Sequence, residues 1–426
     1  MKKAMKVLAL VLVAAMLLGT VAGCANKAAE ETKAAEAAAT EAVVEAAATE
    51  AAVEAVAEAA AEGEEITIAF IGNTTGDYAM YGLPVRNSVM MYFDDLNAAG
   101  GINGKQVNVL EYDDKADGVE SVNAFNLAMD NGITAVVGSV LTGATIALTD
   151  ATYEVNMPQI TASATAAGVT VIDPDDPNSE IRTNVFRSCF IDPFQGEKMA
   201  EYAANVCGAK TAAVFYETGN DYSEGLLAAF VAKAEELGLE IVASEAFATG
   251  DKDYKAQMTN IAAANPDVVF APIYYGEAGL AVTAARQAGC KAQFLGGDGF
   301  GSIKEYASAE DLEGTVYCSG YAPGTESVKA FEEEYLAVYG EEVPNMFAPL
   351  AYDACLLLTI GLQAAEDAGL EAGSEEYKQA VIDAIKNVQG VEGITGTYSF
   401  DEFNNPIKSA AIIELKGGQE SFKEMY

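Results

Sequence analysis

From residue 66 onward the sequence predicts an α/β protein made of two similar lobes, each built on a parallel sheet. Short runs rich in β-branched residues alternate with longer helical stretches, which is typical of βα units around a parallel sheet. This alternation occurs twice along the chain, in a similar order each time. The 426 residues are 51% hydrophobic, so the chain can bury a core, and roughly 100 to 200 residues per domain suggests two or three domains.

The first series of elements begins at a run of β-branched residues. Its strands are predicted from short apolar runs, at residues 66–72, 107–112, 135–138, 159–162 and 184–189. Its helices are predicted from apolar residues at helical spacing, at residues 85–98, 119–130 and 144–153. Gly100 and Gly101 end the first of these helices, because glycine adopts the backbone conformation that follows a helix.

The second series repeats this pattern and is followed by a helical tail. Its predicted strands are residues 211–216, 240–243, 268–274 and 293–295. Its predicted helices are residues 195–204, 224–237, 254–263 and 277–287. The tail is predicted to hold helices at 327–339, 347–368 and 375–386, and a strand pair within residues 396–415.

Residues 1–24 have the pattern of a secretion signal. Lys2, Lys3 and Lys6 precede an apolar run at 7–18, which is too short for a permanent membrane span. The run leads into Val-Ala-Gly-Cys at 21–24, which resembles the lipobox of bacterial lipoproteins. We therefore expect Cys24 to carry a lipid anchor, although a cysteine can also follow a signal sequence by chance.

Residues 25–64 consist almost entirely of Ala, Glu, Thr and Val. Such a low-complexity composition cannot form a core, and it predicts a tether between the membrane and the folded domain. Its alanine content would also permit a transient helix, so its conformation stays open.

Charge and composition exclude several classes of function. The chain has 64 Asp and Glu against 24 Lys and Arg, a formal net charge of −40, and a surface this acidic repels nucleic acid and anionic lipid headgroups. It contains no histidine, which excludes Ser-His-Asp triads and histidine metal sites. We expect no cofactor, no metal site and no nucleic-acid partner.

From residue 65 onward, short motifs follow one another in an order that is similar to that of a known family. The motifs are Tyr-Gly at 81–82, residues 96–104, Tyr-Asp-Asp at 112–114, and residues 157–165, 221–225, 286–289, 296–299 and 350–354. Together they resemble the type I periplasmic binding proteins of the branched-chain amino acid class, the substrate-binding components of ABC importers. The likeness covers the chain from residue 65 to its end.

The resemblance implies two Rossmann-like lobes joined by a three-crossing hinge, with the ligand held between them. Residues 65–190 and 322–395 would form lobe 1, and residues 191–321 and 396–426 would form lobe 2. The disulfide common in such binders is not expected, because its positions hold Ala116 and Leu141. Beyond Cys24 the cysteines are odd in number, so at least one thiol is unpaired: Cys189, Cys207, Cys290, Cys318 and Cys355.

The resemblance also implies a set of ligand-binding residues in lobe 1. Thr142 falls where the family meets the ligand carboxylate at a helix N-terminus, and Ser163 and Thr165 match a second carboxylate-binding loop. The simpler interpretation of these hydroxyl residues is ordinary helix capping.

In lobe 2, Asp298 matches the acid that pairs with the α-ammonium group of the ligand. Many members have Glu there, so the shorter Asp leaves the ligand identity open; the alternative role of Asp298 is an Asp-Gly turn. The family's aromatic positions hold Tyr222 and Tyr274, faced by Tyr81 and Phe347 from lobe 1. For each of these rings, core packing is the alternative.

The sequence therefore predicts an extracytoplasmic lipoprotein, monomeric and held at the membrane by its lipid anchor alone. It would capture an amino acid, branched-chain or otherwise apolar, and deliver it to an ABC permease driven by a cytoplasmic ATPase. Two alternatives stay open: a receptor module of the same fold for a small amide, carboxylate or aromatic acid, and an α/β enzyme using Asp298 and a tyrosine as acid and base.

Overall fold

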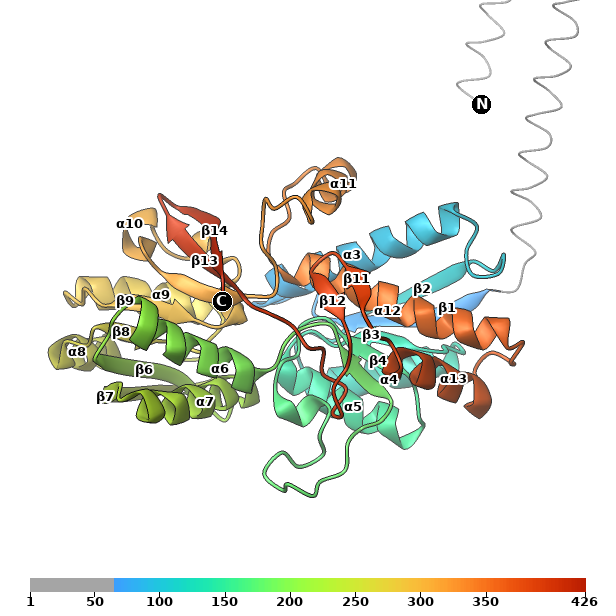
Figure 1. Ribbon diagram of the computed structural model, residues 1–426, viewed down its shortest axis with the longest axis horizontal. Coiled ribbons are helices and arrows are strands. Elements are labelled where there is room, and N and C mark those ends of the chain that lie inside the picture. The colour runs from blue at the N-terminus through green and yellow to red at the C-terminus, as the bar shows by residue number, and fades with distance from the viewer. Residues whose placement is uncertain (1–64) are drawn as a thin grey trace, which may run out of the picture. The chain divides into compact units, whose positions relative to one another are not determined.

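The computed structural model describes residues 65–426, which fold into a two-lobed unit (Figure 1). The predicted signal peptide, Cys24 and the tether at residues 25–64 lie outside the described residues. Each lobe has its own sheet, and helices cover both sheets, as the alternating pattern predicts.

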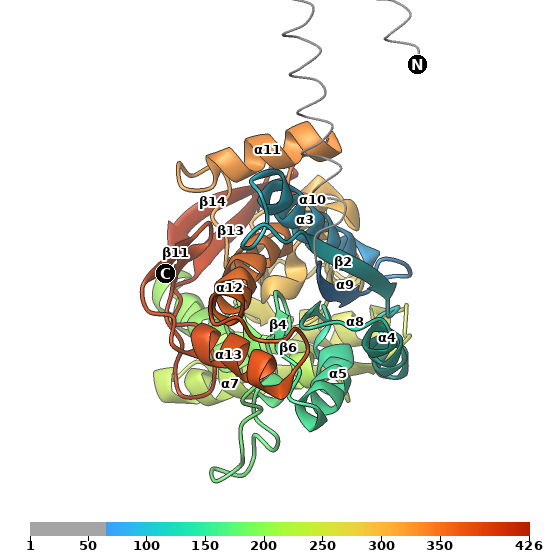
Figure 2. The ribbon, with the colours of Figure 1, turned by 90° about the vertical axis from the view of Figure 1, so that its right-hand side faces the viewer.

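The first lobe contains a five-stranded, fully parallel sheet with the order β2-β1-β3-β4-β5. Its strands are β1 (Ile66–Gly72), β2 (Val107–Asp113), β3 (Val136–Gly138), β4 (Gln159–Thr161) and β5 (Val185–Arg187). Its helices are α3 (Ala79–Ala98), α4 (Gly118–Asp130), α5 (Thr142–Glu154), α11 (Lys329–Tyr339), α12 (Phe347–Asp367) and α13 (Glu375–Lys386). In this lobe α12 packs against both α3 and α13 (Figure 2).

The second lobe contains a seven-stranded sheet with the order β14-β13-β10-β9-β8-β6-β7. Its strands are β6 (Thr211–Thr218), β7 (Glu240–Ala248), β8 (Val268–Phe270), β9 (Gln293–Gly296), β10 (Val316–Ser319), β13 (Ala411–Lys416) and β14 (Gln419–Met425). Its helices are α6 (Asp192–Glu201), α7 (Asp221–Leu237), α8 (Lys255–Ala264), α9 (Tyr275–Gln287) and α10 (Ala309–Leu312). Strands β6 to β10 are parallel to one another, whereas β13 is antiparallel to both of its neighbours, β10 and β14.

The chain passes between the lobes three times, at residues 188–191, 320–328 and 399–410. These crossings match the three-crossing hinge that the resemblance implies. The lobes also meet directly, because α5 of the first lobe contacts α7 of the second.

The predicted strand pair within residues 396–415 is wrong. β12 (Gly396–Tyr398) pairs with β11 (Val391–Gly393), while β13 joins the second sheet. The predicted lobe boundary between residues 395 and 396 thus falls inside the β11–β12 hairpin. The prediction also misses β10, β11 and β14; β14 alternates exposed and half-buried residues at the edge of its sheet, so it has no apolar run to detect.

Helix α3 begins at Ala79, six residues before its predicted start, and it contains Pro84. A proline inside a helix cannot donate the hydrogen bond to the carbonyl four residues earlier, which here belongs to Met80. That carbonyl instead accepts a 2.8 Å bond from Asn345 Nδ2. The proline alone would predict that the helix ends there. The long-range contact with Asn345 satisfies the carbonyl that the proline leaves without a donor, so the helix continues.

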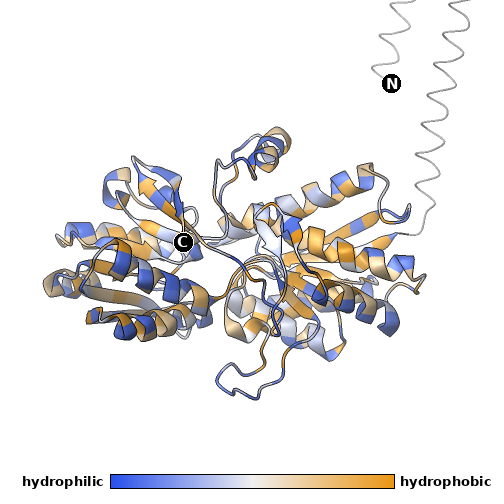
Figure 3. Cartoon of the chain, viewed as in Figure 1, coloured by the Kyte–Doolittle hydropathy of each residue, from blue (hydrophilic) through white to orange (hydrophobic). Residues whose placement is uncertain are grey.

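In Figure 3 the strands of both sheets are largely hydrophobic, whereas hydrophilic residues are spread over helices and loops. In the described part of the chain, one helix, α12, is long and apolar enough to cross a membrane. However, 67% of its apolar window is buried inside the protein, which is what a core helix requires.

Candidate functional site

The predicted site residues come together where the two lobes meet. A nearly filled cavity of about 10 Å³ lies between the lobes. Seven of the eight predicted residues line it, together with Val140, Leu141 and Gly299: Tyr81, Thr142, Ser163, Tyr222, Tyr274, Asp298 and Phe347. The eighth, Thr165, is fully buried but does not line the cavity.

On the first-lobe side, the site is built from the loops that follow β3 and β4. Thr142 is the first residue of α5, and the residue before it, Leu141, is the N-cap and provides no side-chain cap. The first backbone N–H groups of a helix lack partners within the helix, so the start of α5 presents donors beside the cavity. Ser163 Oγ donates a 2.7 Å bond to the carbonyl oxygen of Val140, which ties the two loops together.

On the second-lobe side, Asp298 follows β9 and opens a short 3₁₀ helix. Its side chain is buried, and Oδ1 has no hydrogen-bond partner among the described residues. Its backbone N–H donates a 2.8 Å bond to Gln195 Oε1. Burial raises the pKa of Asp298 to about 7, because removing a carboxylate from water disfavours its charged form. Asp298 is thus a buried acid with unused acceptor capacity.

A second buried carboxyl group, that of Asp192, lies near Asp298 and is not among the residues predicted from the sequence. Asp192 is the first residue of α6, directly after the first crossing. It is fully buried, and neither carboxyl oxygen finds a hydrogen-bond partner within residues 65–426. Its backbone N–H donates to the carbonyl oxygen of Thr165, which places the eighth predicted residue beside it. Burial raises the pKa of Asp192 well above its ordinary value, and the charge of Asp298 adds to this, whereas the Thr165 side chain and the positive charge of buried Arg187 act in the opposite direction.

The only sequence signal for Asp192 is the Asp-Pro pair at 192–193, which is typical of a helix start. What makes this acid unusual is its tertiary setting. A Cβ atom on Gly225 of α7 would lie 3.3 Å from Asp192 Oδ2, so α7 covers the carboxyl group closely.

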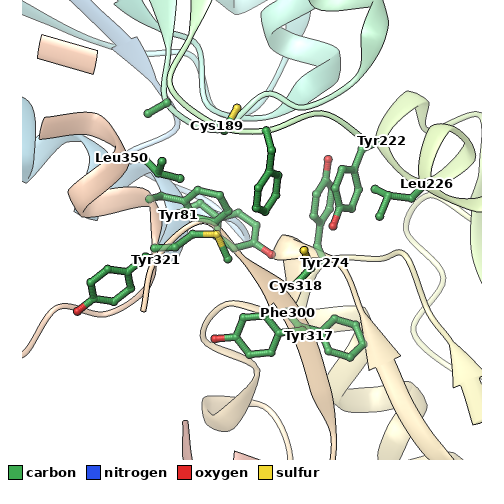
Figure 4. Close-up of a cluster of buried hydrophobic side chains, with 14 of the residues drawn as sticks. Tyr81, Cys189, Tyr222, Leu226, Tyr274, Phe300, Tyr317, Cys318, Tyr321 and Leu350 are labelled. Atoms are coloured by element: carbon green, nitrogen blue, oxygen red, sulfur yellow. The ribbon is translucent and has the colours of Figure 1, made fainter. Parts of the chain in front are cut away.

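Aromatic rings form the walls of the site, and Figure 4 shows Tyr222 and Tyr274 face to face with Tyr81 opposite them. The Tyr222 and Tyr274 rings stack with centroids 4.9 Å apart at 13°. Tyr81 meets Tyr274 edge-on at 5.8 Å and Phe347 at 5.0 Å. Its hydroxyl donates a 2.5 Å bond to the carbonyl oxygen of Gly299, from the first lobe to the second. The aromatic residues therefore fill the space between the lobes and connect them.

Gly299 is required by close packing. A Cβ atom there would lie 2.7 Å from the hydroxyl of Tyr222 and 2.9 Å from the carbonyl oxygen of Ile273. Its backbone N–H also donates a 2.8 Å bond to the Tyr222 hydroxyl. The Gly-Asp-Gly motif thus seats Tyr222 against the backbone that presents Asp298, which a turn alone would not require.

All five cysteines in the described region are free: Cys189, Cys207, Cys290, Cys318 and Cys355. Four of them are buried, and Cys207 is half-buried. Within residues 65–426, no group of three or more Cys, Asp or Glu is placed to hold a metal ion.

A buried site between two α/β lobes, with a buried acid on one side and a helix N-terminus on the other, is the arrangement of a two-lobed ligand-binding protein. The family model for periplasmic binding proteins matches residues 65–420, and the chain belongs to this family. The family consists of substrate-binding proteins.

Named relatives agree with this assignment. The chain is 30% identical over 341 residues to the Leu/Ile/Val-binding protein BraC3 of Rhizobium johnstonii, which covers 79% of this chain and 88% of that protein. A branched-chain amino acid transporter substrate-binding protein, LivJ of Streptococcus pneumoniae in complex with isoleucine, is similar in structure, with a TM-score of 0.75 and 31% identity over 84% of this chain and 99% of that one. A leucine-binding protein of Thermotoga maritima has a TM-score of 0.75 and 30% identity over 84% of this chain and 98% of that one.

Proposed function

We propose that the protein captures an amino acid, branched-chain or otherwise apolar, between its two lobes and delivers it to an ABC permease. In this proposal it binds a ligand and catalyses no reaction. The names of the similar proteins support this, since they include Leu/Ile/Val-binding proteins and an isoleucine complex. The observation that carries the proposal is the buried carboxyl group of Asp298, which lines the cavity between the lobes. The buried carboxyl group of Asp192 lies near Asp298 without lining that cavity.

Asp192 and Asp298 are the groups proposed to hold the ligand ammonium. Both are buried and both have carboxyl oxygens without partners in the described part of the protein. A buried carboxylate without a partner is costly, and a cationic ligand group would supply the missing hydrogen bonds and restore the charged form. Asp298 is one methylene shorter than Glu, but Asp192 provides a second acid on the same side.

The ligand carboxylate is proposed to meet the N-terminus of α5. The backbone N–H groups and partial positive charge there favour an anion, and Thr142 lines the cavity at this point. A zwitterion would then be bound at its two ends by opposite lobes.

The apolar side chain of the ligand is proposed to lie against Tyr81, Tyr222, Tyr274 and Phe347. A cavity of about 10 Å³ has room for about one water molecule, not for an amino acid. Ligand entry therefore requires the lobes to part and Tyr81 to leave Gly299. Hinge closure around a ligand is a common motion of two-lobed binding proteins.

Delivery would take place at the outer face of the membrane. We propose that signal peptidase cleaves the chain just before Cys24, that diacylglycerol anchors this cysteine, and that residues 25–64 act as the tether. The monomeric protein would dock on permease subunits coupled to a cytoplasmic ATPase. Mass spectrometry of the detergent-extracted protein tests the anchor: it should show a diacylglyceryl group on Cys24 that is lost in Cys24→Ser.

The function is tested by thermal-shift and calorimetric titration of the processed chain, with Cys24→Ser for solubility, against the twenty amino acids and simple carboxylates. A ligand at a hundredfold excess over its Kd stabilises the folded state by about 2.7 kcal/mol. Leucine, isoleucine or valine should raise the melting temperature. If every amino acid fails while a carboxylate or aromatic acid binds, the receptor alternative replaces this proposal.

A further inference from the structure

A second group of contacts joins the lobes at the rim of the cleft, outside the proposed ligand site. Residues 76–80, at the start of α3 in the first lobe, face the first turn of α9 in the second lobe across a cavity of about 440 Å³. The residues that make polar contacts across this rim are Asp77 and Tyr78 on one side and Lys252, Tyr275 and Glu277 on the other.

Lys252 contacts acids of both lobes. Its Nζ atom lies 3.7 Å from Asp77 Oδ2 in the first lobe and 3.3 Å from Glu277 Oε1 in the second. The same Glu277 oxygen accepts a 3.4 Å bond from the Tyr78 hydroxyl. Tyr275 donates a 2.6 Å bond to the carbonyl oxygen of Asp77. Asp77 and Tyr78 are therefore held from the opposite lobe by an ion pair and two hydrogen bonds.

The two acids that Lys252 contacts, Asp77 and Glu277, differ in burial. The Glu277 side chain is 8% exposed, and its Oε2 has no hydrogen-bond partner among residues 65–426. The Asp77 side chain is 80% exposed. Burial raises the pKa of Tyr78, and the negative charges of Glu277 and of another buried acid, Glu217, raise it further, so both acids lie close to this rim. Lys252 and Glu277 belong to the same lobe, so their ion pair does not depend on the position of the other lobe. The contact of Lys252 with Asp77 joins the two lobes, so it exists only when the lobes are closed.

We propose that Lys252, positioned by Glu277, is a latch that holds Asp77 against the second lobe and slows ligand release. The role of the latch in ligand release rests on the proposed function, whereas its effect on lobe closure does not. When the lobes part, Asp77 and Tyr78 leave with the first lobe, and Lys252 and Glu277 remain paired on the second. Lys252, Asp77 and Glu277 line the rim cavity and none of them lines the proposed ligand cavity. Tyr78 adjoins the ligand cavity only through its edge-on contact with Tyr274, at a centroid distance of 5.2 Å.

Exposed ion pairs are individually weak, and they are screened by salt. Removing the ion pair between Lys252 and Asp77 should raise the ligand dissociation rate roughly twofold to fivefold, with the association rate nearly unchanged. The difference between the wild type and a latch variant should shrink as salt is raised, because the Lys252 and Asp77 side chains are both well exposed.

Stopped-flow tyrosine fluorescence, or release of labelled ligand, tests the latch with Lys252→Gln. The matched control is Lys255→Gln, because Lys255 is 74% exposed and pairs with Asp253 of its own lobe. Lys252→Gln should raise the dissociation rate and Lys255→Gln should not. Asp77→Asn should have a similar effect, and combining it with Lys252→Gln should add little. Equal dissociation rates for Lys252→Gln and Lys255→Gln would overturn the proposal.

A ligand-free measurement separates this proposal from the proposed function. Small-angle scattering of the ligand-free protein should show a larger radius of gyration for Lys252→Gln than for Lys255→Gln. If the wild type binds no amino acid, the proposed function fails, and scattering still decides the latch. Identical scattering of the two variants would then overturn it.

Discussion

The hydroxyl of Tyr81 in the first lobe donates a 2.5 Å hydrogen bond to the carbonyl oxygen of Gly299 in the second, one residue from the buried acid Asp298. The same hydroxyl accepts a 3.2 Å bond from the backbone N–H of Tyr275. Tyr81, in the first turn of α3, thus bonds the first lobe to the loop of the second lobe that carries Asp298, the acid proposed to bind the ligand ammonium.

Tyr81→Phe should favour the open arrangement of the ligand-free protein. The substitution keeps the ring contacts and removes the two lobe-bridging hydrogen bonds, each worth about 1 kcal/mol. Scattering should show an increased radius of gyration, with a small decrease in melting temperature. Tyr112→Phe is the control, because the Tyr112 hydroxyl contacts Asn131 within the first lobe. The same radius of gyration in both variants would mean that Tyr81 does not hold the lobes together.

The stability of the ligand-free protein should depend on pH through Asp298. Burial raises its pKa to about 7, whereas a carboxyl group in an unfolded chain titrates near 3.9. The folded state therefore keeps a proton that the unfolded chain releases. The contribution of Asp298 to the free energy of unfolding is fully present below about pH 4 and is lost as pH rises to about 7. Above that pH the contribution of this group no longer changes.

Melting temperatures of the wild type and Asp298→Asn, measured from pH 4.5 to 8 at fixed ionic strength, check this dependence. The wild type should lose stability relative to the variant across this range. Burial also raises the pKa of Asp192, so the variant should keep part of the slope. Parallel curves for the two proteins would show that Asp298 ionises normally.

Gly299→Ala should destabilise the protein and weaken ligand binding together. The new methyl group would lie 2.9 Å from the fixed carbonyl oxygen of Ile273 and would push the Tyr222 hydroxyl away. Such overpacking costs about 1 to 3 kcal/mol, which chemical denaturation can measure. At Gly276 the nearest atom to a new Cβ is 3.9 Å away, so Gly276→Ala should not destabilise. If Gly299→Ala is as stable as Gly276→Ala, the loop has more freedom than its packing indicates.

Much of the fold could be predicted because its strands are short apolar runs that differ clearly from the helices. The errors occur where tertiary contacts replace local signals. Helix α3 continues through Pro84 because Asn345, far away in sequence, satisfies the carbonyl of Met80. β14 is a polar edge strand that only its pairing with β13 defines.

The candidate site was predictable to the extent that its motifs resemble those of a known family. Thr142, Ser163 and Asp298 each follow a strand end of the first or second sheet, so their motifs could be placed without coordinates. Asp192 could not be recognised, because its Asp-Pro start resembles many helix starts and its carboxyl group is buried by tertiary packing, including that of α7. The contact of Lys252 with Asp77 likewise joins residues far apart in the chain.

The central claim is that buried carboxyl groups bind the ligand ammonium. The most direct measurement is calorimetry of leucine and of 4-methylpentanoate, which lacks the amine, with the wild type, Asp298→Asn and the exposed control Asp253→Asn. Removing one partner of a buried charge pair typically costs about 2 kcal/mol or more. Asp298→Asn should therefore weaken leucine roughly thirtyfold or more and leave the affinity for 4-methylpentanoate nearly unchanged. Equal losses for both ligands would contradict the claim and make Asp298 a structural residue.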